Sequence, residues 1–228
     1  MKYVIVDYRQ VHIQRKFSEM GFKVIPFTAE GLVYPAIDGH PDIFIFFFQH
    51  NFIISPNAPK HIINFFVKNN ISFQYGKKTV GYDYPETVPY NAYVDNEVAI
   101  IHPYIDESIK DFLYNKEIIE VKQGYVRCNV FRIGKSFVTS DVQIHNALIQ
   151  KGFESHYVLP TNIVLPGVKH GFIGGCFGED KESIYFAGNA GFPYFLLFEK
   201  LASYTQKTLI MLGQHGTYDV GGLLIFSD

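Results

Sequence analysis

A pattern of one helix, one strand, a loop and two further strands recurs along this chain at intervals of roughly 40–50 residues. The segment FSEMGFKVIPF at residues 17–27 resembles LIQKGFESHYVL at residues 148–159, because in each an expected helix ends at a glycine before a short strand. The strand ends NFIISPN, SFVTSD and SIYFAGN are also alike, and each precedes an expected helix. This recurrence indicates a repeat architecture.

The two ends of the chain complement each other. The fifth unit lacks its last strand, and YVIVD at residues 3–7 has the character to supply it. Pairing the first strand with the last unit removes exposed sheet edges. We therefore predict an α/β fold of five ββαβ-type units around a pseudo-fivefold axis. This five-bladed α/β propeller is closed by the N-terminal strand and forms one domain of residues 1–228. An open α/β sheet with the same element order is the alternative.

The elements of each unit follow from apolar spacing and turn residues. Five helices are expected, opened by Asp7, Asn57, Asp106, Asp141 and Pro193. Strands are expected over residues 3–6, 23–27, 43–48, 52–54, 72–75, 90–94, 97–101, 118–121, 124–133, 136–139, 155–158, 171–177, 183–187, 208–212 and toward the C-terminus within 219–228.

Charge and cysteine content restrict the functional class. The net charge is −2 without a basic block, which argues against nucleic acid as the main partner. The two cysteines, Cys128 and Cys176, lie far apart and favour a reducing compartment. The longest apolar run, residues 43–48, is far shorter than the ~20 residues of a membrane-spanning helix. We expect a cytoplasmic protein with no membrane partner and no cofactor.

Four motifs occur in a characteristic order: GHPDIF at residues 39–44, VKQGYVRCN at 121–129, HGFIGG at 170–175 and DVGG at 219–222. This set resembles a poorly characterised bacterial family of the pentein fold, the superfamily of guanidino-modifying enzymes. The resemblance implies a nucleophilic Cys in the last unit, a His in the preceding unit and carboxylates that hold a guanidinium group. His170 matches the expected His, but LLIF follows Gly221 and Gly222, with no Cys.

In such a ring the starts of the middle strands converge on the axial cavity. The polar residues expected there are His40, Asp42, Tyr90, Asn91, Cys128, His170, Cys176 and Asp219. We consider Cys128 and His170 as a nucleophile and base pair, because a nearby imidazolium favours the reactive thiolate. Alternatively, Cys128 is a small core residue and His170 is structural.

The remaining candidates are ligand-binding residues. The carboxylates of Asp42 and Asp219 can bind a cationic ligand, and His40 can orient it. Asn91 is a candidate because it is expected at the same cavity. The glycine pairs, Gly174 with Gly175 and Gly221 with Gly222, indicate close backbone approach rather than a phosphate loop. A metal site drawn from His40, Asp42, Cys128 and His170 lacks any metal-specific spacing, and no metal is expected.

Three functions fit these residues. The first is a protein that binds a polar or cationic, amino-acid-like small molecule, such as an arginine-like one, in the axial cavity. The second is a Cys-dependent hydrolase or amidinotransferase that uses Cys128 and His170 on guanidino or amidino groups. The third is a structural or partner-binding protein. The sequence leaves the ligand and the oligomeric state open.

Overall fold

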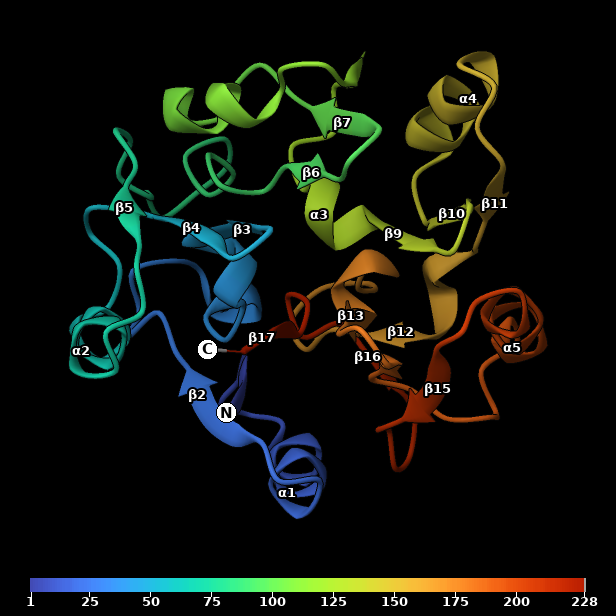
Figure 1. Cartoon of the computed structure of the whole chain (residues 1–228), viewed down its shortest axis with the longest axis horizontal. Coiled ribbons are helices and arrows are strands. Elements are labelled where there is room, and N and C mark those ends of the chain that lie inside the picture. The colour runs from blue at the N-terminus through green and yellow to red at the C-terminus, as the bar shows by residue number, and fades with distance from the viewer. Residues whose placement is uncertain (228) are drawn as a thin grey trace.

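The computed structural model describes residues 1–227. The longer α-helices, of nine residues each, lie around the outside of the molecule, and the short helix α3 lies near its centre (Figure 1). The helices expected after Asp7, Asn57, Asp141 and Pro193 are confirmed, whereas a 3₁₀-helix follows Asp106. The α-helices are α1 (Val11–Glu19), α2 (Lys60–Lys68), α3 (Val126–Asn129), α4 (Val142–Gln150) and α5 (Phe195–Ser203). The 3₁₀-helices are η1 (Pro35–Ile37), η2 (Pro41–Ile43), η3 (Glu107–Phe112), η4 (Pro160–Asn162) and η5 (Gly174–Cys176).

Five three-stranded sheets, counted over residues 1–227, share one order. In each, the middle strand pairs antiparallel with one neighbour and parallel with the other. The strands, sheet by sheet, are β17 (Leu224–Ser227), β1 (Lys2–Asp7) and β2 (Lys23–Phe27); β3 (Ile45–Phe48), β4 (Asn51–Ile54) and β5 (Gln74–Tyr75); β6 (Tyr93–Val94), β7 (Val98–Ile101) and β8 (Glu117–Glu120); β9 (Val130–Ile133), β10 (Ser136–Thr139) and β11 (Ser155–Tyr157); β13 (Phe177–Glu179), β14 (Ser183–Phe186) and β15 (Thr208–Met211). A parallel pair is formed by β12 (Ile163–Val164) and β16 (Thr217–Tyr218).

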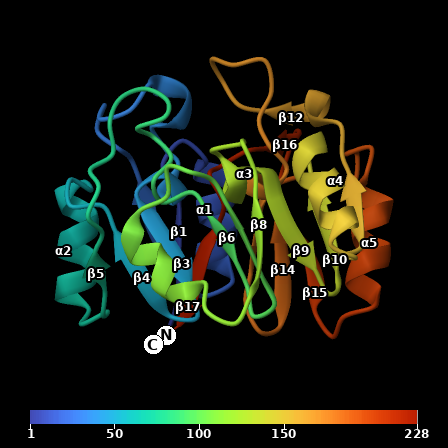
Figure 2. The ribbon, with the colours of Figure 1, turned by 90° about the horizontal axis from the view of Figure 1, so that it is seen from above.

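The two ends of the chain meet in one sheet. Strand β1 pairs antiparallel with β17, with Tyr3 opposite Phe226 and Ile5 opposite Leu224. The N-terminus and the C-terminal strand consequently lie side by side in both views of the ribbon (Figures 1 and 2). Stacked rings of Tyr3 and Phe226, whose centroids lie 5.2 Å apart, add an aromatic cross-strand contact.

Helix capping agrees with the sequence at two helices and differs at two. The carboxylate of Asp106 accepts from Ser108 N at the start of η3. Asp141 caps α4 as predicted, since its carboxylate accepts hydrogen bonds from Gln143 N and Ile144 N. The predicted cap of α1 is wrong, because the carboxylate of Asp7 is instead held by the side chain of Arg9. A second predicted cap is also wrong.

The second wrong cap prediction concerns Asn57, which precedes α2. The N-cap of α2 is Pro59, which has no side-chain hydrogen bond. Asn57 binds the chain segment around Val80 instead, accepting from Val80 N and donating to Val80 O. Both wrong caps are therefore polar residues that hold loops rather than helix ends.

Two predicted strands begin with a helical turn. Residues 171–177 contain η5 and only then enter β13, and residues 124–133 contain α3 before β9. The two turns pack closely, since a Cβ atom on Gly174 would lie only 2.5 Å from Arg127 O and Val130 N. The strand predictions were wrong there because close packing between distant segments decides the backbone, which local periodicity does not report. These turns position the site described below.

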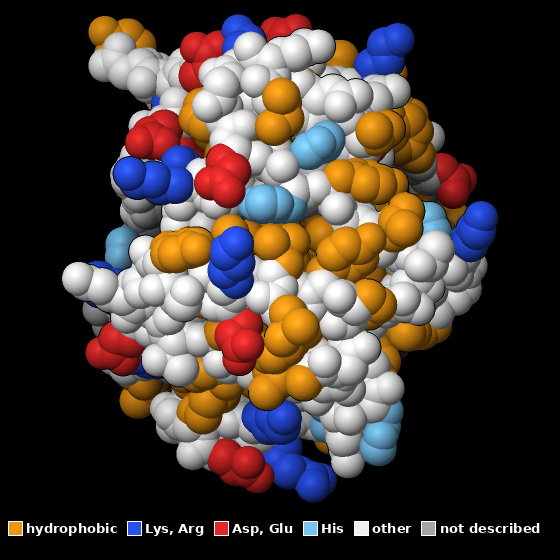
Figure 3. All heavy atoms as spheres, turned by 90° about the vertical axis from the view of Figure 1, so that its right-hand side faces the viewer, with side chains coloured by type: hydrophobic (Ala, Val, Ile, Leu, Met, Phe, Trp, Pro, Cys, Tyr) orange, Lys and Arg blue, Asp and Glu red, His pale blue; other side chains and the backbone are white. Residues whose placement is uncertain are grey.

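The outer surface carries mixed side chains. Over the face formed by α4 and α5, charged side chains of both signs surround hydrophobic ones (Figure 3). Exposed hydrophobic residues of these two helices include Ile149 and Leu196. Within residues 1–227, the helices are too short or too polar to cross a membrane.

Candidate functional site

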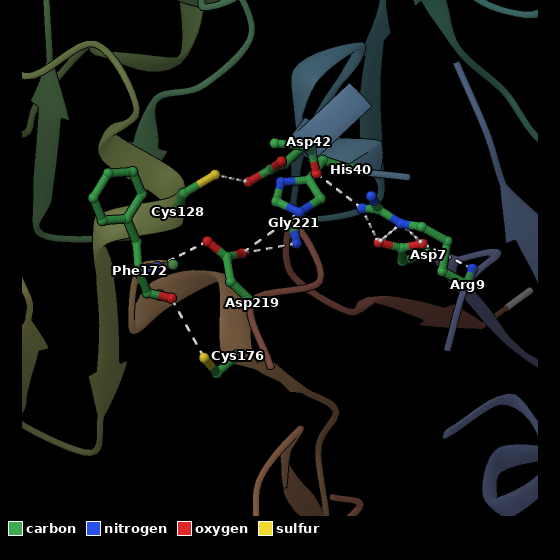
Figure 4. Close-up of polar contacts among 12 residues, drawn as sticks. Asp7, Arg9, His40, Asp42, Cys128, Phe172, Cys176, Asp219 and Gly221 are labelled. Carbon is green, nitrogen blue, oxygen red and sulfur yellow. Dashed lines mark hydrogen bonds and ion pairs between the residues drawn. The ribbon is translucent and has the colours of Figure 1, made fainter. Parts of the chain in front are cut away.

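Several candidate residues lie shortly before the strand that pairs antiparallel with the middle strand of its sheet. His40 and Asp42 precede β3, Asn91 precedes β6, and Cys128 precedes β9. Asp219 lies in the segment that leads into β17. These positions converge in the folded chain, and Figure 4 shows His40, Asp42, Cys128 and Asp219 pointing toward one another. We call these four residues the central cluster.

The thiol of Cys128 is bound by polar groups from the segments that precede β3 and β6. It donates a hydrogen bond to Oδ2 of Asp42 at 2.9 Å and accepts one from Nδ2 of Asn91 at 3.3 Å. The side-chain oxygen Oδ1 of Asn91 accepts in turn from the backbone nitrogens of Arg127 and Cys128. Asn91 thus fixes the start of α3 and the direction of the thiol.

His40 and Asp219 form the other half of the central cluster. Nε2 of His40 lies 3.9 Å from Oδ1 of Asp219, and both side chains are 1% exposed. The carboxylate of Asp219 accepts hydrogen bonds from Phe172 N at 2.8 Å and from Gly221 N at 3.1 Å. Backbone donors therefore hold this carboxylate in place beside the imidazole.

Burial shapes the acid–base behaviour of the central cluster. Loss of hydration raises the pKa of Asp42 to about 6, although the thiol of Cys128 and the charge of Arg127 oppose the shift. Burial also raises the pKa of Asp219, against the charge of His40. Desolvation, followed by the charge of Asp42, raises the pKa of the Cys128 thiol well above its ordinary value. Burying ionised carboxylates away from water costs free energy, and a bound cation would reduce that cost.

A cavity of about 120 Å³ adjoins the central cluster. Its polar wall contains His40, Cys128, His170 and Asp219, and its aromatic wall contains Tyr34, Tyr125 and Phe172. The structure thus brings His170 to the same cavity as Cys128 and Asp219. Nδ1 of His170 lies 3.1 Å from the carbonyl oxygen of Gly171.

The glycine pairs serve close packing of backbone around the cluster. The carbonyl oxygen of Gly175 accepts hydrogen bonds from the nitrogens of Val220 and Gly222, which joins η5 to the segment before β17. The carbonyl oxygen of Gly174 accepts from the guanidinium of Arg127 at 2.9 Å. Gly221 lies against His40, where an added Cβ would be 2.5 Å from the histidine Cβ.

Cys176 occupies a different environment from Cys128. Its thiol is buried and contacts the carbonyl oxygen of Phe172 at 3.4 Å. In Figure 4 it lies below Asp219, apart from the thiol of Cys128. Cys176 therefore provides a matched buried cysteine outside the central cluster.

Three side chains of the site were not predicted from the sequence. Arg127 bridges α3 and η5, and its position next to Cys128 was the only signal available. The hydroxyl groups of Tyr34 and Tyr125 lie 3.1 Å apart on the cavity wall. With 16 tyrosines in the chain, nothing local distinguished these two.

Comparisons with known proteins bear on the fold and on the family of the chain. A family model described as "Family of unknown function (DUF6873)" matches residues 5–224. No curated protein matches the sequence. The resemblance to the pentein fold expected from the four motifs is confirmed by solved structures of similar architecture.

Three of these structures illustrate the similarity. Dimethylarginine dimethylaminohydrolase from Pseudomonas aeruginosa, a mutant complexed with citrulline, is 9% identical with a TM-score of 0.56, and the match covers 92% of this chain and 91% of that one. Agmatine deiminase from C. jejuni is 9% identical with a TM-score of 0.57, covering 94% and 90%. An amidinotransferase from Microseira wollei is 12% identical with a TM-score of 0.53, covering 92% and 88%. At identities this low, the structural similarity shows a shared fold and nothing further.

Proposed function

Because the chain belongs to the family of unknown function DUF6873 and has the fold of guanidino-modifying enzymes, we propose that it binds a small cationic, amino-acid-like ligand beside Asp219. The observation that carries this proposal is the cavity that joins a buried carboxylate to aromatic side chains. A planar cation can share hydrogen bonds with Asp219 and stack on Tyr34, Tyr125 or Phe172.

The size of the cavity specifies the part of the ligand that enters. A volume of about 120 Å³ is roughly that of four water molecules. It suits a head group of about four non-hydrogen atoms, which is the size of a guanidinium or amidinium group. The fold relatives add support, since they include an agmatine deiminase and a hydrolase of dimethylarginine solved with citrulline.

We also propose that the five three-stranded sheets form the blades of a five-bladed ring. Five sheets of the same internal order support it, as does the pairing of β1 with β17. In this arrangement the central cluster lies on the axis, and the ligand approaches along it.

A thermal-shift experiment with agmatine and arginine tests the ligand. Wild-type protein is expected to melt at a higher temperature with one of them, because a ligand that binds only the folded state stabilises it. Asp219→Asn should weaken that binding about 10-fold or more, since a hydrogen bond to a charged group contributes about 1.5–3 kcal/mol. Asp111→Asn, at an exposed position, is the control and should bind as wild type does. Equal affinity of Asp219→Asn and wild type would remove the proposed role.

The catalytic alternative, with Cys128 as nucleophile and His170 as base, has weaker support. Both residues line the cavity, but the thiol donates to Asp42 and burial raises its pKa. A protonated thiol is a poor nucleophile.

Thiol labelling separates the two functions. Cys128 is 2% exposed and Cys176 is 0% exposed, so we expect iodoacetamide to modify neither at an appreciable rate in the folded protein at neutral pH. Both should react once urea unfolds the chain. Rapid labelling of Cys128 alone, slowed by agmatine, would instead support the catalytic function.

A further inference from the structure

Three chemically different ligand groups meet within the central cluster. A ring nitrogen of His40, a carboxylate oxygen of Asp42 and the sulfur of Cys128 all lie within 4.8 Å of one another, and all three residues are buried. Ligands of a tetrahedral zinc ion are about 3.3–3.8 Å apart, given bond lengths of about 2.0–2.3 Å. Side-chain adjustments on the order of 1 Å are therefore sufficient to place all three around one ion.

The same side chains have unused hydrogen-bonding capacity. Across residues 1–227, neither ring nitrogen of His40 has a hydrogen-bond partner, and Oδ1 of Asp42 also lacks one. Both residues are only 1% exposed. Buried polar atoms in proteins are nearly always paired, and a group of unpaired ones at a single point indicates a bound ion or water. This observation is independent of the distances.

We propose that His40, Asp42 and Cys128 form a binding site for one zinc ion. On binding, a bond from zinc to sulfur replaces the S–H bond of Cys128, and the proton passes to solvent. A set of imidazole, thiolate and carboxylate suits zinc, whereas magnesium and calcium require mainly oxygen ligands.

The surroundings match those of a metal site with an open position. In Figure 4 the imidazole of His40 lies between the carboxylates of Asp42 and Asp219. One nitrogen can therefore bind zinc while Nε2 interacts with Asp219, as second-layer carboxylates do at zinc sites. His40 and Cys128 also line the cavity, so the fourth position of the ion faces it.

This inference goes beyond the proposed ligand and does not depend on it. The test uses the whole chain of residues 1–228, stripped of metal with a chelator and titrated with zinc alone by calorimetry. We expect roughly one zinc per chain. Cobalt should give the near-ultraviolet absorption of a cobalt–thiolate bond. Cys128→Ser should lose that absorption and weaken zinc binding by more than about 100-fold, which exceeds the effect of losing a second-layer partner.

Cys176→Ser is the matched control, because it removes the other buried thiol and should leave zinc binding and the cobalt absorption unchanged. If Cys128→Ser fails to fold, Asp42→Asn and His40→Gln test the same site at similar side-chain volume. The inference is overturned if wild type takes up no zinc, or if folded ligand variants bind it as tightly as wild type does. Agmatine binding is measured separately on metal-free protein, so failure of one proposal leaves the other to be judged by its own result.

Discussion

Replacing Phe177 by alanine is expected to lower the free energy of unfolding by about 3–5 kcal/mol. Phe177 is 0% exposed. Its ring stacks on Phe131 at a centroid distance of 4.7 Å and on Phe186 at 4.9 Å, and meets Phe198 edge-on at 5.2 Å. The substitution removes these contacts and leaves a cavity where the sheets of β9 and β13 pack against α5. Urea denaturation followed by circular dichroism measures the change.

A surface residue of α5, the helix whose Phe198 contacts Phe177, serves as the control. Leu196 in α5 is 75% exposed, so Leu196→Ala should change stability by no more than about 0.5 kcal/mol. If Phe177→Ala cost less than about 1 kcal/mol, the aromatic packing around β13 would not be the main support of this region.

Replacing Gly221 by alanine is expected to affect both stability and the site. Gly221 has φ +66°, and a methyl group there would lie 2.5 Å from Cβ and 2.6 Å from Cα of His40. The left-handed backbone costs about 1–2 kcal/mol for alanine. Overpacking against His40 adds about 1–3 kcal/mol, for a total of about 2–5 kcal/mol. Since Cα of His40 must move, the imidazole should also shift away from Asp219.

Gly152→Ala separates the two contributions to this loss. Gly152 has φ +81°, but no atom lies within 4 Å of the added methyl group. It should therefore lose only the backbone contribution of about 1–2 kcal/mol and retain zinc and ligand binding. Equal losses at the two glycines would show that contact with His40 is not the reason for glycine at position 221.

Much of the fold was predictable because it is encoded locally. The helical spacing of Ile13, Phe17 and Met20 predicts α1, in which Ile13 and Phe17 are buried, whereas Met20 is exposed at its end. Asp141 predicts the start of α4. The repeat of these local signals also predicted the pairing of the first and last strands. Each such signal depends on residues within one or two helical turns.

The candidate site was predictable in part. Its acidic residues, His40 and Cys128 follow from short motifs before the expected strands. Their hydrogen-bond partners do not follow from these motifs, because the sequence offered the pair of Cys128 and His170 only as one alternative, and the thiol of Cys128 is bound by Asp42 and Asn91. Arg127 also remained unassigned, since its partner Gly174 lies 47 residues away.

The sequence by itself determined the recurrence of elements, the pentein-like order of motifs and the absence of a cysteine after Gly222. Each of these features depends only on short segments of neighbouring residues. Only the tertiary structure decided that residues 126–129 and 174–176 become helical turns and that four buried polar side chains meet. The physical reason is that steric fit, loss of hydration and hydrogen-bond pairing depend on groups far apart in the chain. Their mutual distances are set only when the whole chain has folded.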